Sequence, residues 1–399
     1  MKDQIITFKL KSKYHLLAIL TSVFCALTQA ADPLPLEKLN MPTGFSIAVF
    51  AEVENPRQMA LGEDGAVYVG SLRAGKVHRL RDIDGDGIAD QVTLVAADLD
   101  LPSGLAYRDG DLYVGAVNQI LAFRDIKQQL LNKAPEQLAT SEVLTTALPT
   151  ERHHGWKYLA FGPDGYLYIP VGAPCNICQP DSPFASIQRM NVDASPATFE
   201  PYALGVRNTV GFDWHPDTGE LWFTDNGRDM LGDDLPPCEL NRVTQAGQHF
   251  GYPFFHGQSI PDPEFSAGHN PTDYIEPALD LGPHVAPLGM MFYTGTMLPS
   301  AYHKQILIPE HGSWNRTPEA GPTGYRITLA RMDDQGGMHY EVLVDGWLQD
   351  NVAWGRPADL LQMADGSILI ADDKANVIYR LSYSAPAIET PILEQITYR

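Results

Sequence analysis

Cationic side chains are scarce in this sequence of 399 residues. Lys and Arg number 28 against 49 Asp and Glu, which gives a formal net charge of −21 at pH 7. Nucleic-acid binding depends on clustered cations that neutralise phosphates. The charge balance therefore argues against a nucleic-acid binder.

Long apolar runs are missing after the first thirty residues. Four lysines within residues 1–13 precede the apolar run 16–27, which is too short to span a bilayer and ends near Ala30. We predict a cleaved signal peptide over residues 1–30, and a periplasmic or secreted mature chain without a membrane span. A lipid anchor on Cys25 is the alternative, and the bulky Phe24 before it is a poor match to a lipidation site.

Cysteine is rare, and three of the four cysteines lie in the predicted mature chain. They are Cys175, Cys178 and Cys238. Zinc would need four ligands, and no second cysteine pair or paired histidine spacing is present to complete such a site. In an exported chain the spacing favours a local bridge between Cys175 and Cys178, or a reduced pair, and leaves Cys238 unpaired.

Helical patterning is also scarce, while glycine and proline are plentiful at 34 and 31 residues. Only residues 126–139 suggest a short helix. A phrase made of an Asp-Gly type turn and an alternating apolar strand recurs instead, as is typical of hairpins. It appears at 62–69, 108–114, 162–169, 215–223 and 364–370, with a weaker copy at 302–308.

A second phrase follows each copy, namely a short strand with a basic residue near its end. These basic residues are Arg79, Arg124, Arg189, Arg242, Arg331 and Arg380. Each of the two repeated segments occurs six times. We therefore predict that residues 31–399 form an all-β domain, folded as one six-bladed β-propeller with four-stranded antiparallel blades. A large insertion, roughly 225–300, falls in the region of the fourth and fifth blades, and we expect strand 45–50 to close the ring.

Residues 82–90 match a calcium-binding loop. Carboxylates occupy positions 1, 3, 5 and 9 of this loop, and a glycine occupies position 6. A main-chain carbonyl at position 7 supplies one more oxygen. Position 12 is Thr93 in place of Glu, so the loop is incomplete. We predict a structural calcium site, with an acidic hairpin as the alternative; its ligands are Asp82, Asp84, Asp86, Ile88 and Asp90.

Three further segments could carry chemistry. His153 and His154 precede the third repeat, where an imidazole could act as a general base. Arg207 and Asn208 offer donors that suit a carboxylate. The acidic turn 224–229 offers oxygens to a cation, although ordinary turn chemistry explains the same residue types.

Taken in order, these segments resemble a known family. The segments are His154 before 162–164, then 205–208, 224–229 with 233–234 and 239–241, 250–253, 311–316 and 355–359. The chain resembles the pyrroloquinoline quinone (PQQ) dependent soluble sugar dehydrogenases, and more closely their sorbosone dehydrogenase-like branch. The resemblance implies hydride transfer from a sugar or aldehyde to PQQ, assisted by Ca²⁺, with a soluble cytochrome as a candidate electron acceptor.

The resemblance also implies roles for single residues. His154 resembles the general base, and Arg207 with Asn208 resembles the pair that holds the quinone oxygens. The carbonyls of Gly227 and Arg228 resemble ligands of the catalytic calcium. Three further positions are implied: Arg356 as a partner of a PQQ carboxylate, and Glu239 with the Phe250 carbonyl as ligands of a second, structural calcium.

The chain departs from the family at two places that matter for the site. Ala173 stands where glucose-oxidising members have an Asp near the base, so His153 stays a second candidate. The family's cofactor-binding lysine has no counterpart, and we expect Arg316 to replace it. Because PQQ carries three carboxylates, we also expect the side chains of Arg207, Arg228, Arg316 and Arg356 to converge on it.

Two other functions compete with the dehydrogenase. Six-bladed propellers with a central cation also hydrolyse lactones, and a calcium-stiffened propeller can serve as a binding module. Four convergent arginines favour the dehydrogenase, because lactone hydrolysis needs mainly a metal and carboxylates.

Overall fold

The computed structural model describes residues 33–386, except 133, 135, 136, 195, 196, 334 and 336. The predicted signal peptide, residues 1–30, lies outside the described residues. In the unit Pro35–Arg399, the described part contains one α-helix, α1 (Ile126–Asn132), and strands β1 to β29. None of its helices is long and apolar enough to cross a membrane.

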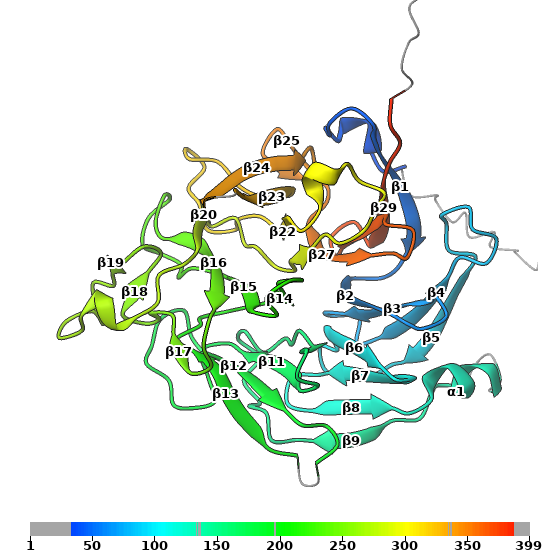
Figure 1. The fold of residues 1–399 in the computed structure, drawn as a ribbon, viewed down its shortest axis with the longest axis horizontal. Helices are drawn as coiled ribbons and strands as arrows, with labels where there is room; N and C mark the ends of the chain where they lie inside the picture. The colour runs from blue at the N-terminus through cyan, green and yellow to red at the C-terminus, as the bar shows by residue number, and fades with distance from the viewer. Residues whose placement is uncertain are drawn as a thin grey trace, which may run out of the picture. The chain divides into compact units, whose positions relative to one another are not determined.

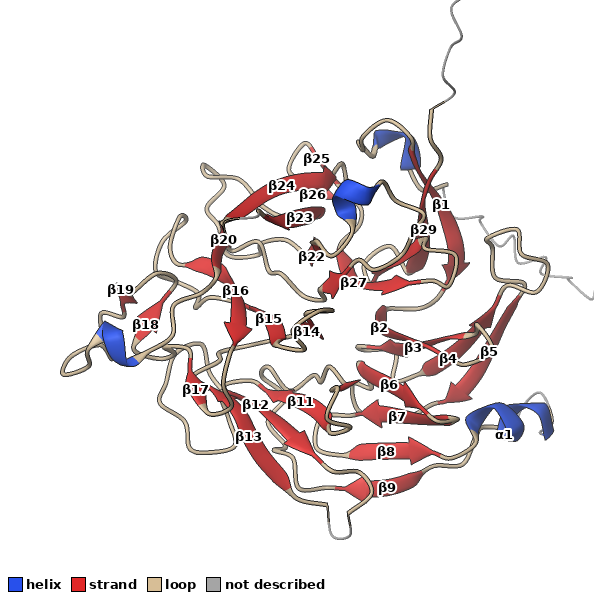
Figure 2. Cartoon of the chain, viewed as in Figure 1, coloured by secondary structure: helices blue, strands red, loops and turns tan. Residues whose placement is uncertain are grey.

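Six blades of four antiparallel strands are arranged around a common centre (Figure 1, Figure 2), and the sheet of the third blade gains a fifth, parallel strand, β17 (Gln248–His249). Blade one has β2 (Pro56–Leu61), β3 (Val67–Ser71), β4 (Val77–Arg81) and β5 (Gln91–Ala96). Blade two has β6 (Gly104–Arg108), β7 (Asp111–Gly115), β8 (Ile120–Phe123) and β9 (Glu142–Thr145). Blade three has β10 (Ala160–Phe161), β11 (Leu167–Val171), β12 (Ser186–Met190) and β13 (Phe199–Leu204).

The second half of the chain builds three more blades of the same kind. Blade four has β14 (Gly211–Trp214), β15 (Leu221–Asp225), β16 (Pro237–Val243) and β20 (Leu279–Pro283). Blade five has β21 (Met291–Phe292), β22 (Ile306–Glu310), β23 (Arg326–Met332) and β24 (Met338–Val344). Blade six has β27 (Pro357–Gln362), β28 (Ile368–Asp372), β29 (Val377–Tyr383) and β1 (Phe45–Glu52).

Strand β1 closes the ring as the sequence predicts. It pairs antiparallel with β29, from Phe45 opposite Tyr383 to Glu52 opposite Val377. The predicted insertion lies inside blade four, between β16 and β20. It holds β17 (Gln248–His249), which pairs parallel with β13, a hairpin of β18 (Phe255–His256) and β19 (Ile260–Pro261), and the 3₁₀ turn Pro271–Asp273. A second small hairpin, β25 (Leu348–Gln349) with β26 (Val352–Ala353), precedes blade six, and two further 3₁₀ turns are Leu36–Lys38 and Ser300–Tyr302.

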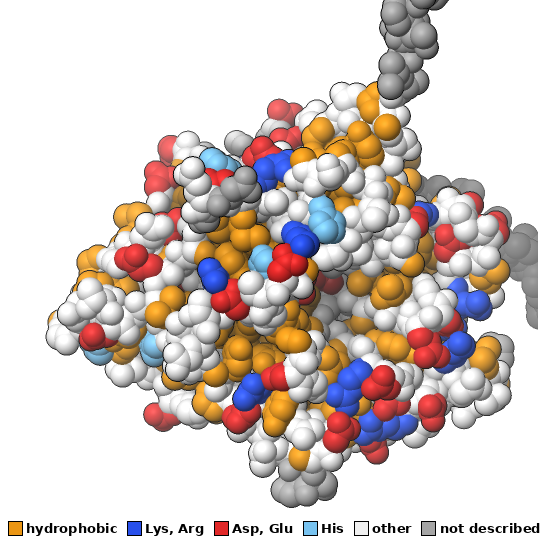
Figure 3. Space-filling view, viewed as in Figure 1, with side chains coloured by type: hydrophobic (Ala, Val, Ile, Leu, Met, Phe, Trp, Pro, Cys, Tyr) orange, Lys and Arg blue, Asp and Glu red, His pale blue; other side chains and the backbone are white. Residues whose placement is uncertain are grey.

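The two repeated phrases turn out to be partners. In five blades the arginine of the second phrase bonds to the turn carboxylate of the first, because the strands that carry them are neighbours. The pairs are Arg79 with Asp64, Arg124 with Asp111, Arg189 with Asp164, Arg242 with Glu220, and Arg380 with Asp365. In blade five, Arg331 instead pairs with Glu341 and bonds to the Ala301 carbonyl. Along the edge of the face in view over β6–β9, Figure 3 shows cationic side chains beside acidic ones.

Apolar clusters fill the spaces between neighbouring blades. One cluster joins blades one and two through Val77, Leu105 and Phe123, and similar clusters join the following blades. The cluster between blades six and one contains Phe50, Val69 and Ile378. The second strands β3, β11, β15, β22 and β28 are buried along their whole length. Burial on both faces fixes the strand ends on which the functional side chains sit.

Cys175 and Cys178 form a disulfide, which confirms the local bridge that their spacing favours. Cys238 is a buried free cysteine. Burial raises the pKa of its thiol to about 11, which makes it a poor nucleophile.

Candidate active site

A cavity of about 490 Å³ opens at one end of the propeller. Most of its lining comes from segments that precede the first strand of a blade or follow the second strand, and Arg57 and Cys238 come from the ends of β2 and β16. In an antiparallel blade these segments emerge at the same end, so residues far apart in sequence meet there. The segments that supply the lining lie before β2, β10, β14, β21 and β27 and after β3, β15, β22 and β28.

The cavity is cationic although the whole chain is acidic. Five Lys and Arg side chains line it against two carboxylates, an excess of three positive charges. These residues are Arg57, Arg73, Arg207, Arg356 and Lys374, with Asp229 and Asp373. A low-dielectric concave site of this kind concentrates positive potential and selects anionic ligands.

His154 lies in the wall of this cavity and is almost fully buried. Its backbone has φ +52°, a left-handed conformation that non-glycine residues seldom adopt. The neighbouring strand leaves room for it only because residue 172 is glycine: a Cβ there would lie 2.6 Å from the His154 Cβ. The sequence therefore holds His154 in an unusual backbone conformation beside the cavity.

The hydrogen bond of His154 defines its chemistry. Its Nδ1 lies 2.8 Å from the Ala173 carbonyl oxygen, which can only accept, so Nδ1 carries the proton and Nε2 is left as a base. Burial, followed by the charge of Arg207, lowers the pKa of His154 to about 2 and keeps the ring neutral. The backbone carbonyl of Ala173 therefore orients the His154 ring. The His153 ring contacts that of His154 in a tilted arrangement, with 4.1 Å between ring centroids, but His153 is exposed and does not line the cavity.

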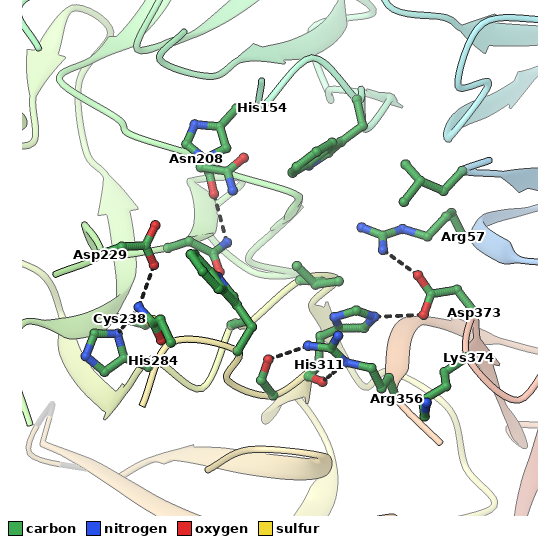
Figure 4. Close-up of a pocket in the computed structure, with 18 of the residues that line it drawn as sticks. Arg57, His154, Asn208, Asp229, Cys238, His284, His311, Arg356, Asp373 and Lys374 are labelled. Carbon is green, nitrogen blue, oxygen red and sulfur yellow. Dashed lines mark hydrogen bonds and ion pairs between the residues drawn. The ribbon is translucent and has the colours of Figure 1, made fainter. Parts of the chain in front are cut away.

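Arg207 and Asn208 line the same cavity as His154, and Figure 4 shows Asn208 beside His154. Their backbone N–H groups donate to the buried carboxylate of Asp225 at 2.7 and 2.6 Å, which fixes the start of blade four. The amide side chain of Asn208 makes no hydrogen bond to another residue in the described part of the chain and lines the cavity. It is therefore free to bind a ligand.

Two of the four predicted arginines do not reach the cavity. The Arg228 guanidinium pairs with the buried Asp262 at 2.5 Å and with Glu264, both from the insertion. Arg316 bonds to the Asp233 and Gly321 carbonyls and to Asp234. Neither side chain is part of the cavity lining. The expectation that four arginine side chains converge on one ligand site is therefore wrong for Arg228 and Arg316, because their guanidinium groups donate to oxygens of nearby loops.

Other cations, which were not predicted from the sequence, line the cavity instead. Arg57 stands at the start of β2, and Lys374 follows β28. Asp373 joins Arg57 to His311, with Arg57 Nη1 at 2.9 Å and His311 Nε2 at 2.8 Å from its two oxygens (Figure 4). Arg356 donates to the carbonyls of His311 and Gly312. In the sequence, Arg57 and Lys374 could have been found only from their positions next to the repeated strands.

The lone cations at the rim are Arg73 and Lys374. Both side chains are exposed and line the cavity, and neither makes an ion pair within the described residues. Lys374 therefore offers a free ammonium group to a ligand in the cavity, whereas Arg316 does not reach it.

The residues predicted to bind the catalytic calcium and those predicted to bind the second calcium lie in two different places. The Gly227 carbonyl faces the cavity wall and accepts from Arg207 Nη1 at 2.8 Å. Glu239 and Phe250 lie behind that wall, where they line a small buried void together with Asp225. Burial and the nearby Asp225 raise the pKa of Glu239 to about 8. A cation in the void would offset these two buried carboxylates.

The calcium-like loop 82–90 lies at the opposite end of the propeller from the cavity. Residues after β3 line the cavity, β4 then runs away from it, and the loop joins β4 to β5 at the far end. Asp82, Asp84 and Asp86 place carboxylate oxygens within 4.8 Å of one another. Asp82 and Asp90 also accept backbone N–H groups of the loop. Any cation here would stiffen the blade, and its presence stays a prediction.

The fold and the site together define a class of protein, namely a six-bladed propeller whose cation-lined cavity holds a buried, neutral histidine. The family model described as glucose/sorbosone dehydrogenase matches residues 112–309. A protein of Borreliella burgdorferi of uncharacterised function is 32% identical over 378 residues, which cover 92% of this chain and 96% of that protein. The chain belongs to the glucose/sorbosone dehydrogenase family.

Solved structures share the fold. A Trichoderma reesei enzyme of Carbohydrate-Active Enzymes Family AA12 is 20% identical with a TM-score of 0.72, covering 87% of this chain and 98% of that one. The holo PQQ domain of a Coprinopsis cinerea pyranose dehydrogenase is 17% identical with a TM-score of 0.70, covering 86% and 97%. The PQQ-bound aldose sugar dehydrogenase of Streptomyces coelicolor is 17% identical with a TM-score of 0.60, covering 86% and 100%.

Proposed function

We propose that this protein is a PQQ-dependent dehydrogenase that oxidises a sugar, or a related alcohol or aldehyde. One observation carries the proposal. A buried histidine with a free Nε2 shares a cavity of about 490 Å³ with an excess of three positive charges. A family of sugar dehydrogenases provides the chemical context.

The donor set of the cavity fits PQQ. The cofactor carries three carboxylates, which match the charge excess of the lining. Arg356, Lys374 and Arg73 would hold carboxylates, and Asn208 would donate to a quinone oxygen. Arg207 contributes its charge, because its five N–H groups already bond to protein oxygens. When bound, PQQ supplies the acceptor for a hydride from the substrate carbon.

His154 accepts the substrate's hydroxyl proton at Nε2 in this proposal. The Ala173 carbonyl keeps the ring oriented while Nε2 takes the proton. The fixed charge of Arg207 then favours release of that proton from the imidazolium. Trp156, which packs edge-on to His154 at 5.9 Å, helps to exclude water from the base.

The proposal includes three calcium sites. We assign to a cation beside the cofactor the carbonyl of Gly227, which lines the cavity, and that of the next residue, Arg228. We assign Glu239 and the Phe250 carbonyl to a cation behind the wall. The third is the far loop with Asp82, Asp84, Asp86, Ile88 and Asp90. A cation next to a quinone withdraws charge and stabilises its reduced form.

We place the protein outside the cytoplasm, with electrons leaving to an acceptor such as a soluble cytochrome. The Cys175–Cys178 disulfide supports an oxidising compartment. The leader-like segment of residues 1–30 supports export.

A substrate screen tests the function. Purified protein would be loaded with PQQ and Ca²⁺ and assayed on aldoses, polyols, aldehydes and lactones with an artificial electron acceptor. Dye reduction that requires both PQQ and a sugar or aldehyde is expected. Lactone hydrolysis without PQQ, and no dye reduction with any substrate, would contradict the proposal and favour a hydrolase.

A further inference from the structure

The four-residue disulfide ring Cys175–Cys178 contains a residue that is bonded to the cavity wall at four points. The Asn176 carbonyl accepts from Arg207 Nε at 2.8 Å, and Asn176 Oδ1 accepts from Arg207 Nη2 at 2.8 Å. Asn176 Oδ1 also accepts from the Asp229 backbone N–H at 2.8 Å, and Asn176 Nδ2 donates to the Asp229 carbonyl at 3.0 Å. The Asn176 side chain therefore binds the Arg207 guanidinium and the backbone of Asp229.

Arg207 depends on these contacts for its position. Its remaining donors go to the Asn226 and Gly227 carbonyls and to Asp229 Oδ2. Two of its five hydrogen bonds end on Asn176, and a third ends on Asp229, which Asn176 itself holds. Replacing Asn176 by alanine removes the Nη2–Oδ1 hydrogen bond and both side-chain hydrogen bonds to the Asp229 backbone. The main-chain carbonyl of residue 176 still accepts from Arg207 Nε, and Asn315 Nδ2 still donates to the Asp229 carboxylate.

The disulfide fixes Asn176 in turn. Cys178 N–H donates to the Tyr252 hydroxyl oxygen at 3.1 Å, and the Cys175 sulfur lies 3.4 Å from the same oxygen. Tyr252 is buried and packs with Ala173, the residue whose carbonyl orients His154. The ring is thus attached to the core on one side and to the charged wall on the other.

We infer that Asn176 is a positioning residue for the active site and that the Cys175–Cys178 disulfide exists to present it to Arg207 and Asp229. An asparagine suits this position because it accepts two hydrogen bonds and donates one. The short ring reduces the conformational freedom of the loop, so the contacts form at lower entropic cost. The consequence for Arg207 stands on the geometry alone, whereas the consequence for PQQ rests on the function proposed above.

Arginine labelling tests the first consequence without any cofactor. Phenylglyoxal modifies accessible guanidinium groups, and peptide mass spectrometry would give the rate at Arg207 separately from Arg57 and Arg356. In Asn176→Ala, and in Cys175→Ser/Cys178→Ser, Arg207 should react about tenfold faster than in the native protein, as expected when hydrogen bonds to a charged group are lost. The rates at Arg57 and Arg356 should not change.

A conservative variant and a remote one provide controls. Asn176→Asp keeps the acceptor oxygen and should hold Arg207 close to its native labelling rate, and it covers the case in which Asn176→Ala fails to fold. Asn40→Ala removes an exposed side-chain hydrogen bond to Asp345 and should leave labelling unchanged. Equal labelling of Arg207 in native protein, Asn176→Ala and the double serine variant would overturn the inference.

PQQ titration tests the second consequence and separates it from the proposed function. Asn176→Ala should weaken the Kd for PQQ by about tenfold, because a mobile Arg207 must be ordered on binding. Faster labelling of Arg207, together with no PQQ binding by any variant including the native protein, would support the positioning role and contradict the cofactor. Native PQQ affinity with native labelling in Asn176→Ala would contradict the positioning role alone.

Discussion

Replacing His154 by alanine separates the base from its neighbour His153. The substitution removes Nε2 and also the N–H that donates to the Ala173 carbonyl at 2.8 Å. Loss of a positioned general base typically lowers the rate by about 10²–10⁴-fold. We expect kcat/KM to fall within this range, while PQQ still binds because the cationic lining is untouched.

The structure also sets the size of the stability effect. The Ala173 carbonyl loses its donor and the buried ring leaves a small cavity, which together should destabilise the fold by about 2 kcal/mol. For a domain of this size that corresponds to a drop in Tm of about 3 °C. A variant that melts much earlier would be unsuitable for the kinetic comparison.

The assay uses the substrate that the native protein oxidises fastest, with an artificial electron acceptor, and measures the PQQ Kd by absorbance titration. His153→Ala is the matched control, because this ring is exposed and lies outside the cavity. It should keep nearly native kcat. Full activity in His154→Ala, or an equal loss in His153→Ala, would refute the assignment of the base.

Three further outcomes follow from the site and the blades. Arg356→Met should weaken PQQ binding by about tenfold or more, because it removes a charged donor from the cavity; an unchanged Kd would contradict its role. Glu239→Gln should abolish one calcium-dependent rise in Tm, since a buried carboxylate is lost from the void beside Phe250; a native response to calcium would contradict that site. Asp64→Ala should lower the urea unfolding free energy by about 2–3 kcal/mol, because it strands the buried Arg79 guanidinium; a change close to zero would contradict the turn pairing.

Stability should also fall on acidification because of His311. Burial lowers the pKa of this histidine to about 4, so it is neutral when folded, while the unfolded side chain takes a proton near its ordinary pKa of 6.5. The folded-state pKa is depressed, so the contribution to stability is present above about pH 6.5 and is lost as the pH falls towards 4. The urea midpoint should therefore fall more between pH 7 and pH 5 in the native protein than in His311→Gln. Equal drops would contradict the assignment.

The fold was predictable because its information is local. Each blade repeats a tight turn and a strand within a few residues, and the arginine that follows pairs with the turn carboxylate, as Arg124 does with Asp111. Strand β1 was predictable as the closing strand because an open ring would leave unpaired edges. The outer strands were harder to place, since the insertion separates β16 from β20 by a long stretch.

The site was predictable where a motif borders a strand. His154, Arg207, Asn208, Gly227 and Arg356 all line one cavity because antiparallel blades bring such borders to the same end. Their chemical roles stay predictions.

The errors at the site came from side-chain partners that are distant in sequence. Arg228 is captured by Asp262, which arrives from the insertion, and no local pattern shows that contact. Arg57 and Lys374 were missed because a single cation carries no motif. The orienting carbonyl of Ala173 was missed because a backbone acceptor leaves no mark on residue identity.

Calcium-dependent binding of PQQ tests the central claim most directly. Purified protein would be titrated with PQQ in the presence of Ca²⁺ and, separately, with Ca²⁺ removed by a chelator, and followed by absorbance and calorimetry. The account predicts saturation at one PQQ per chain, weakened by chelation and by Arg356→Met. Stabilisation by calcium with no PQQ binding at any concentration would contradict the account.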